Sequence, residues 1–496
     1  MFSELLDKIG DWNPQLYREL KGRFIPRNLI ITIGCSLMTS LLLILMFSNS
    51  EFGLIFNKIN WLVPIILVTG GVYQLSYDLA KEYQKRTLNF IAFTPQSSQK
   101  ILLGKILGVP SLIYLGVALL LPLHLVSGMA YGASFLTILS IYTFWIVGCF
   151  VFYNIALFYV VVRTKENKIA PENIAGYTTG SALILGVIAR SCLELLVYHS
   201  SQWYWFGLPL GEVKILAYIW ALLGLSATGY WLWNAVNRRF YSRDKSLLKK
   251  SQVYQLVIFL QLWLLGFVLP GQYSSSSQVE FVGLAFAFLI NSGFYITMVG
   301  ILSPSRQYIL DWTRYHHLER GNKSLYSELI FGEKSPSILA VALSCSITVI
   351  VWLFWVLLLP KSFFESADIS RIQMIIGLIL QLNVWLIYAV IAEILFLKET
   401  IKKEGLSREI LVFAIAVISG LFMSWVILSL KINLPLLWTF TLVPIAVYIK
   451  GSTLTACLGL FLQLVTMVLL TNKLVGTIKQ LGQSETKALL QEGRLQ

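Results

Sequence analysis

Charged residues are scarce in this sequence. Only 13% of its 496 residues are Asp, Glu, Lys or Arg and 56% are hydrophobic, whereas about 25% charged residues is typical of a soluble domain. The apolar residues form long blocks and do not alternate every second residue. This pattern excludes a water-soluble globule and a disordered chain, and it argues against a transmembrane β-barrel. The composition therefore predicts an all-α polytopic membrane protein.

Histidine and cysteine are also few, with four and five residues. All five cysteines lie inside apolar blocks, so they predict small core residues and no disulfide framework or zinc site. The adjacent His316 and His317 would not face one point on a helix, and no third ligand has a useful spacing. We expect no bound metal and no catalytic constellation, so the chain is not predicted to be an enzyme.

A phosphate-binding loop of the form Gly-x-x-x-x-Gly-Lys-Ser/Thr is missing as well. The nearest string, Gly332-Glu-Lys-Ser335, lacks the first glycine and the adjacent Gly-Lys pair. We therefore expect no ATPase site and no bound cofactor on this chain.

Membrane spans are predicted where an apolar block reaches about 20 residues, the length that crosses a hydrocarbon core about 30 Å thick. Twelve blocks meet this length, and they lie near 28–47, 61–79, 101–126, 135–162, 176–198, 214–236, 253–271, 280–302, 338–360, 372–397, 410–430 and 453–472. A shorter stretch, 433–449, contains Pro435 and Pro444. It either crosses or forms a re-entrant extracytoplasmic hairpin, and we favour the hairpin.

Lysine and arginine counts predict the orientation. With both termini in the cytoplasm, the inside segments hold 32 of the 39 basic residues and the outside segments hold six, as the positive-inside rule requires. The net charge of +14 thus indicates anionic membrane lipid and not nucleic acid as the partner. We expect a multi-pass protein of the plasma membrane, which is the inner membrane in a bacterium.

An internal similarity divides the spans into six plus six. Val109-Pro-Ser-Leu-Ile113 resembles Ser335-Pro-Ser-Ile-Leu339, and Gly104 matches Gly332 nearby. Chance similarity between two apolar helix starts is the alternative to duplication. The predicted organisation is a first half over 1–236, a second half over 237–472 and a cytoplasmic tail over 473–496.

Two polar segments have helical patterns at the cytoplasmic face. Asn13 and Pro14 are suited to begin an amphipathic interfacial helix before the first span. Residues 78–93 are predicted to form a helix that presents Phe90 and Ile91 beside charged groups, and Pro95 ends it. Such a helix suits docking into a groove of a partner protein, although a solvated loop helix would show the same pattern.

The segment after 78 resembles the coupling segment of permease subunits of type 2 ATP-binding-cassette (ABC) exporters. That pattern has an acidic residue, basic residues, Gly-Thr-Leu, an apolar turn, a proline and a Gly-Lys pair. The matching residues here are Glu82, Thr87, Leu88, Pro95, Gly104 and Lys105. Arg86 stands where the pattern has its glycine. The entry helix and the hairpin before the last span are also similar to that family, while the second half resembles it only in layout.

The resemblance implies a permease without its own ATPase, which would move a substrate when separate nucleotide-binding subunits hydrolyse Mg-ATP. It also implies that those subunits contact the cytoplasmic coupling helix. The expected contact residues are Glu82, Arg86, Thr87, Leu88, Phe90 and Ile91, with Arg314 and Glu319 of the loop 303–336 as counterparts in the second half. The duplication suggests a fused pseudo-dimer, but a second permease chain is also compatible with it. The cargo is left open.

Few charged residues lie inside the predicted spans, and three of them are candidates for a role there. Arg190 and Glu194 are four residues apart, so they share a helix face and can form an ion pair. Glu393 lies near the inner end of its span. Each is either a structural charge or part of a substrate path, because buried charges in membranes are costly and often functional.

Two other functions remain open. Twelve spans in two halves are also typical of a secondary, ion-coupled transporter, which should carry more ionisable residues at mid-membrane. A membrane-embedded transferase or scaffold should show a catalytic cluster on a long loop, and only 303–336 is long enough.

Overall fold

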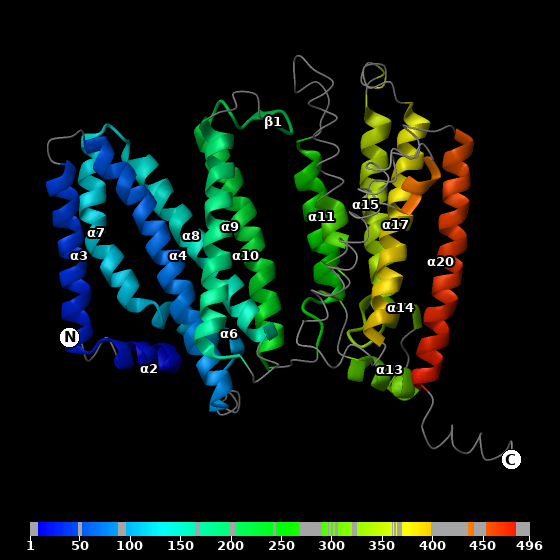
Figure 1. Cartoon of the computed structure of the whole chain (residues 1–496), viewed down its shortest axis with the longest axis horizontal. Coiled ribbons are helices and arrows are strands. Elements are labelled where there is room, and N and C mark those ends of the chain that lie inside the picture. Colours follow the sequence, from blue (N-terminus) through cyan, green and yellow to red (C-terminus); the bar gives the residue numbers. More distant parts are fainter. Residues whose placement is uncertain are drawn as a thin grey trace. The chain divides into compact units, whose positions relative to one another are not determined.

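The protein is almost entirely helical in its computed structural model (Figure 1). The structure describes residues 8–47, 52–87, 96–163, 169–198, 204–241, 245–267, 290–295, 297–298, 301–302, 306–319, 325–359, 361, 364, 370–397, 435–440 and 453–482. The chain forms two compact units, which we treat separately. The first unit is 1–201 with 210–243, and the second is 202–209 with 244–496.

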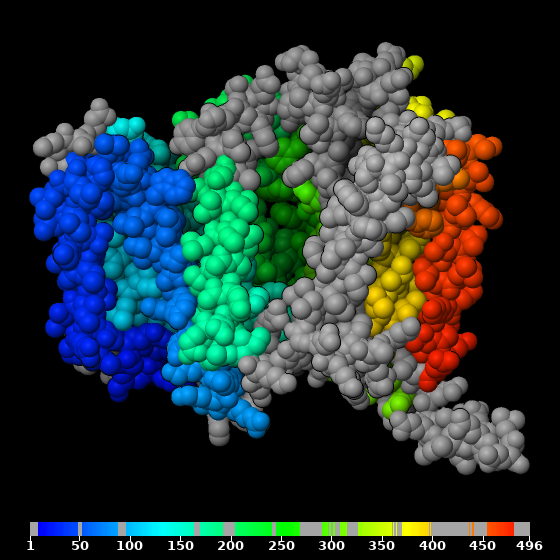
Figure 2. Space-filling view, in the orientation of Figure 1, coloured from blue at the N-terminus to red at the C-terminus, as the bar shows by residue number. Residues whose placement is uncertain are grey.

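Eight helices of the described residues are long and apolar enough to cross a membrane. They are α3 (Pro26–Phe47), α4 (Phe52–Gln84), α7 (Ser111–Ala130), α8 (Phe135–Arg163), α10 (Lys214–Tyr241), α15 (Ile338–Leu358), α17 (Arg371–Leu397) and α20 (Thr453–Gly482). The chain is thus an all-α polytopic membrane protein. Helix α3 buries only Ser36, and Figure 2 shows its side chains uncovered along the edge of the first unit. An apolar surface of this kind faces lipid.

Two more helices coincide with predicted spans, namely α9 (Pro171–Tyr198) and α11 (Lys250–Leu265). Most of the predicted span 280–302 and all of 410–430 lie outside the described residues. Of the stretch 433–449, the structure describes a 3-10 turn, η2 (Pro435–Phe440), which packs against α17 and α20. The count of twelve spans and the re-entrant hairpin therefore stay predictions.

The predicted span 101–126 was wrong in its boundaries. A break at Val109 and Pro110 separates the short helix α6 (Ser98–Gly108) from α7. Proline cannot donate the backbone hydrogen bond that would continue the helix. The hydroxyl of Tyr114 donates to the carbonyl of Ile106 across the break, at 2.8 Å. Lys105 consequently lies on a short helix outside the spans.

Residues 78–84 also differ from expectation. They belong to the last turns of the 33-residue helix α4 and do not begin a separate helix over 78–93. The backbone turns at Arg86, whose φ is 56°, and residues 88–95 lie outside the described part.

Helix α4 is the centre of the first unit, where it packs against α3, α7, α8 and α9. Its buried side chains Val72, Leu75 and Leu79 join Leu157 of α8 in the main core. At Gly71 of α4, a Cβ would lie 2.1 Å from the Tyr153 hydroxyl of α8. Glycine thus lets α8 approach the backbone of α4.

The second unit is built on α11, α15, α17 and α20, which pack in that order. Its core contains buried polar side chains as well as apolar ones. Trp352 donates its indole N–H to the Gln261 side-chain oxygen at 2.8 Å, and the Gln261 amide donates to Asn291 at 2.8 Å. All three residues are buried. Bonds of this kind fix the register between helices inside a membrane.

A small hairpin, β1 (Tyr204–Trp205) and β2 (Leu208–Pro209), belongs to the second unit. Phe206 and Gly207 both have positive φ, as the central residues of a type I′ turn require. The Trp205 indole donates to the carbonyl of Trp263 at 3.1 Å, so the hairpin is attached to the end of α11.

Candidate functional site: two helix joints with buried lysines

The amphipathic helix α2 (Pro14–Arg23) begins as the sequence predicts. The Asn13 side-chain oxygen accepts from the Leu16 amide at 3.1 Å, and its amide group donates to the carbonyl of Lys100 at 2.8 Å. One side chain therefore caps α2 and ties it to α6. Gly104 allows this contact, because a Cβ there would lie 2.9 Å from both Asn13 and Leu16.

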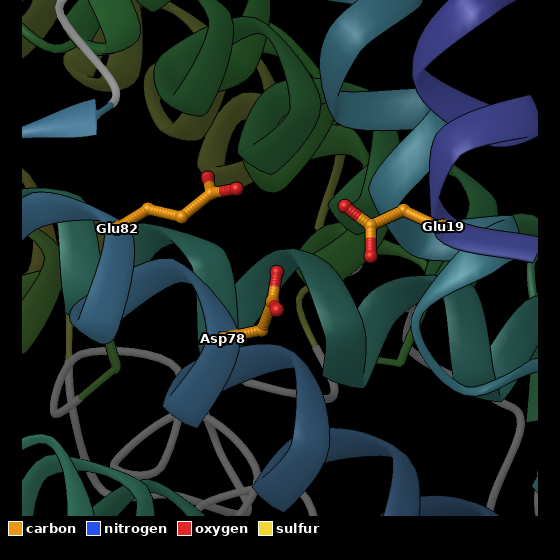
Figure 3. Close-up of side chains that lie close together, drawn as sticks. All are labelled: Glu19, Asp78 and Glu82. Atoms are coloured by element: carbon orange, nitrogen blue, oxygen red, sulfur yellow. The ribbon is translucent and has the colours of Figure 1, made fainter. Parts of the chain in front are cut away.

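A cluster of charges, hereafter the Lys105 cluster, joins α2, α4 and α6. The Lys105 side chain is fully buried. Its ammonium lies 2.7 Å from Glu82, 2.8 Å from Asp78 and 3.6 Å from Glu19. Figure 3 shows how these three carboxylates point toward one another from their helices. The ammonium thus has acidic partners on both α2 and α4.

Two arginines of α2 complete the cluster. Arg18 donates to Glu82 at 2.7 Å, and Arg23 donates to Asp78 at 3.4 Å. Three cations therefore face three anions, so the cluster is neutral as a whole. Such balance is required because an uncompensated charge is costly where water is excluded.

The pKa of Lys105 depends on two opposing effects, burial and the neighbouring carboxylates. Burial alone would lower the pKa of this amine, but Asp78, Glu82 and Glu19 together raise it above its ordinary value. The ammonium therefore stays charged at any physiological pH. The three carboxylates lie close enough together to hold a metal ion, but the Lys105 ammonium already bonds to them. A divalent cation beside this ammonium would be repelled.

The predicted coupling residues fall partly in this cluster. Glu82 belongs to it, and Thr87 donates its hydroxyl to the carbonyl of Glu82 at 3.3 Å. Arg86 adopts the left-handed backbone conformation that favours glycine. Leu88, Phe90 and Ile91 lie outside the described residues.

The loop 303–336 contains two helices, α13 (Arg306–Glu319) and α14 (Leu325–Phe331). Ile309 of α13 is buried against α17 and α20. The Trp312 indole donates to Glu328 of α14 at 2.6 Å. Arg314 is half-buried on α13, and the side chain of Glu319 lies outside the described part. The loop is thus attached to the spans of the second unit.

A second buried lysine lies where α11, α14 and α15 meet. The Lys250 ammonium donates to Ser335 Oγ and to the carbonyl of Leu329, both at 2.7 Å, and to the carbonyl of Pro336 at 3.1 Å. Burial lowers the pKa of Lys250 to about 8, although Glu393 and Glu328 raise it. Unlike Lys105, this lysine is held by neutral acceptors.

Glu393 lies on the other side of the same segment. It is fully buried on α17 and accepts hydrogen bonds from the Ser337 hydroxyl and, at 3.4 Å, from the Ser337 backbone amide. These contacts place the carboxylate at the N-terminal end of α15, where the helix dipole favours a negative charge.

Arg190 lies on α9 in the first unit. Its guanidinium carbon is 3.7 Å from the centre of the Trp61 ring, and it donates to the carbonyl of Asn60 at 3.1 Å. The Asn60 side chain lies 3.2 Å from Nε2 of the buried His124. The side chain of Glu194 lies outside the described part, so the predicted ion pair stays a prediction.

Sequence reasoning missed most partners of the two lysines. The sequence indicated that Asp78 and Glu82 lie together, because acidic residues four apart on a helix share a face. No such pattern marks Glu19 or Lys250. No protein-family model, curated protein or solved structure matches this chain.

Proposed function

We propose that this chain is the transmembrane permease subunit of a type 2 ABC exporter, driven by separate ATPase subunits that bind ATP and Mg. The Lys105 cluster is the main support. Glu82 is the acidic residue of the coupling pattern, and it bonds both to Arg18 of α2 and to Lys105 of α6. A force applied to the residues just after α4 is therefore transmitted to α2, α4 and α6 together.

The mechanism follows from this connection. Closure of the ATPase pair around ATP pulls on the segment after Glu82, in which Phe90 and Ile91 fill a groove of the ATPase. Because α2, α4 and α6 are tied together, they move as one body and rock the spans between inward- and outward-open states. Arg190 and Glu194 in the first unit, and Glu393 in the second, are candidate substrate-path residues.

Arg86 gives independent support for the resemblance. The family pattern has a glycine at this position, and the backbone here has a φ of 56°. Glycine is the residue that adopts this conformation without strain. The local geometry thus agrees with the pattern although the side chain differs.

The proposal includes twelve spans in two related halves, with a re-entrant hairpin before the last span and both termini in the cytoplasm of a plasma membrane. Positions 124 and 352 differ by 228, which is also the separation of the matched Gly104 and Gly332, and both carry a buried ring. His124 lies beside Asn60, and Trp352 is bonded to Gln261, which bonds Asn291. In the second half, α13 and α14 take the coupling role, with Arg314 and Glu319 as candidate contacts.

Site-specific photocrosslinking in cells tests the proposal. A photoreactive residue at Phe90 should crosslink a soluble nucleotide-binding subunit. Tyr131 is the control position. It is an exposed aromatic residue that follows the C-terminal end of α7, the end remote from α6. A crosslink from Tyr131 but none from Phe90 would overturn the coupling assignment. An absence of any ATPase subunit would favour the ion-coupled transporter instead.

A further inference from the structure

The segment Ser335–Ser337 connects α14 to α15, and two buried charges of opposite sign hold it. From α11, the Lys250 ammonium bonds to Ser335 Oγ and the Pro336 carbonyl. From α17, the Glu393 carboxylate bonds to the hydroxyl and amide of Ser337. The three residues are thus bonded on one side to a cation and on the other to an anion.

The contacts of Lys250 also hold the helix α14 that precedes this segment. Lys250 also bonds to the Leu329 carbonyl within α14, and the Tyr254 hydroxyl bonds to the neighbouring Ile330 carbonyl at 2.9 Å. The short helix α14 is therefore attached to the start of α11, while its continuation into α15 is attached to α17. Both attachments thus include hydrogen bonds from buried side chains.

We propose that Lys250 and Glu393 are positioning residues that lock the joint between α14 and α15, and that opening of this joint takes up a proton. The charges that act on the Lys250 ammonium are Glu328 of α14 and Glu393 of α17. The idea that this joint transmits force from α13 and α14 to the spans rests on the proposed function. The lock itself does not.

The sign of the proton linkage follows from the two states of Lys250. In the closed joint its pKa is about 8 because the side chain is buried. Opening exposes the amine to water and restores the ordinary pKa near 10.5. Between these values the open form binds the proton that the closed form lacks, so rising pH favours closure. From pH 7 to 9.5 the opening equilibrium should fall roughly 25-fold.

Hydrogen exchange on the purified full-length chain in detergent tests the lock. The readout is the exchange of residues 329–337, corrected for intrinsic rates and compared with 100–111 in the same molecule. Lys250→Met should speed exchange at the joint roughly tenfold at pH 7, because three acceptors lose their donor. Lys249→Met is the matched control, since the Lys249 side chain is exposed. Equal exchange in the two variants would overturn the lock.

The pH profile separates a positioning role from a merely structural one. In the wild type the opening of 329–337 should fall as pH rises from 7 to 9.5, and Lys250→Met should abolish this dependence. Glu393→Gln should loosen the joint but keep a pH dependence, because Lys250 is still present. A wild-type profile without pH dependence would refute the proton linkage. Failure of an ATPase subunit to bind would refute the proposed function and leave these exchange results unchanged.

Discussion

Replacing Lys105 with methionine tests the charge cluster most severely. Methionine has nearly the volume of lysine but no charge, so the change removes ion contacts of 2.7, 2.8 and 3.6 Å while the packing is largely kept. Removing one partner of a buried ion pair costs about 3–5 kcal/mol. Arg18 and Arg23 still contact all three carboxylates, although two cations then face three anions. We therefore expect a loss near the lower limit, about 3 kcal/mol.

The assay is unfolding of the purified chain in mixed micelles, followed by tryptophan fluorescence. Lys100→Met is the matched control, because Lys100 lies on the same helix with an exposed side chain. The control should unfold within about 0.5 kcal/mol of the wild type. Equal stability of the two variants would refute the claim that the Lys105 ammonium holds the cluster together.

The pH dependence gives a second readout. The raised pKa of Lys105 means that its stabilisation is fully present below pH 10.5 and is lost only as pH rises through the folded-state pKa. The wild type should show no loss due to Lys105 between pH 6 and 10. A wild-type loss of stability in this range that Lys105→Met abolishes would contradict this.

Three further predictions use the same unfolding assay. Arg86→Gly should raise stability by about 1 kcal/mol, since it relieves a left-handed backbone conformation; a loss would contradict the assigned turn. Gly104→Leu should lower stability by about 1–3 kcal/mol and expose α2 to protease, because even a Cβ there would lie 2.9 Å from the α2 backbone. Protease cleavage equal to that of the wild type would contradict the docking of α2 on α6. Trp352→Phe should cost about 1–3 kcal/mol by leaving the buried Gln261 oxygen without its indole donor; wild-type stability would mean that the hydrogen bond contributes nothing.

The helices were largely predictable from the sequence, because a membrane span needs a continuous apolar block and such blocks are visible without any tertiary information. The break in 101–126 was not. Pro64 and Pro122 remain inside α4 and α7, whereas Pro110 separates two helices. Proline alone does not distinguish a tolerated position from a break, since neighbouring helices decide whether the freed backbone groups find partners.

The candidate site was predictable only in part. The cap at Asn13 and the acidic residue Glu82 are local features with local signals. The partners of Lys105 are not local, because Glu19 lies 86 positions before it and is brought there by the docking of α2. Lys250 looked like one basic residue among many at the inner face of the membrane. Only packing shows that it is buried and bonded to the segment between α14 and α15.

The most direct test of the central claim is ATP hydrolysis by whatever co-purifies with the tagged chain in mild detergent. The account predicts a stoichiometric nucleotide-binding subunit and ATP turnover, both lost in the Phe90→Ala/Ile91→Ala double variant and kept in Lys100→Met. A chain that purifies alone and is inert to ATP, or a double variant that retains its partner and normal turnover, would contradict it.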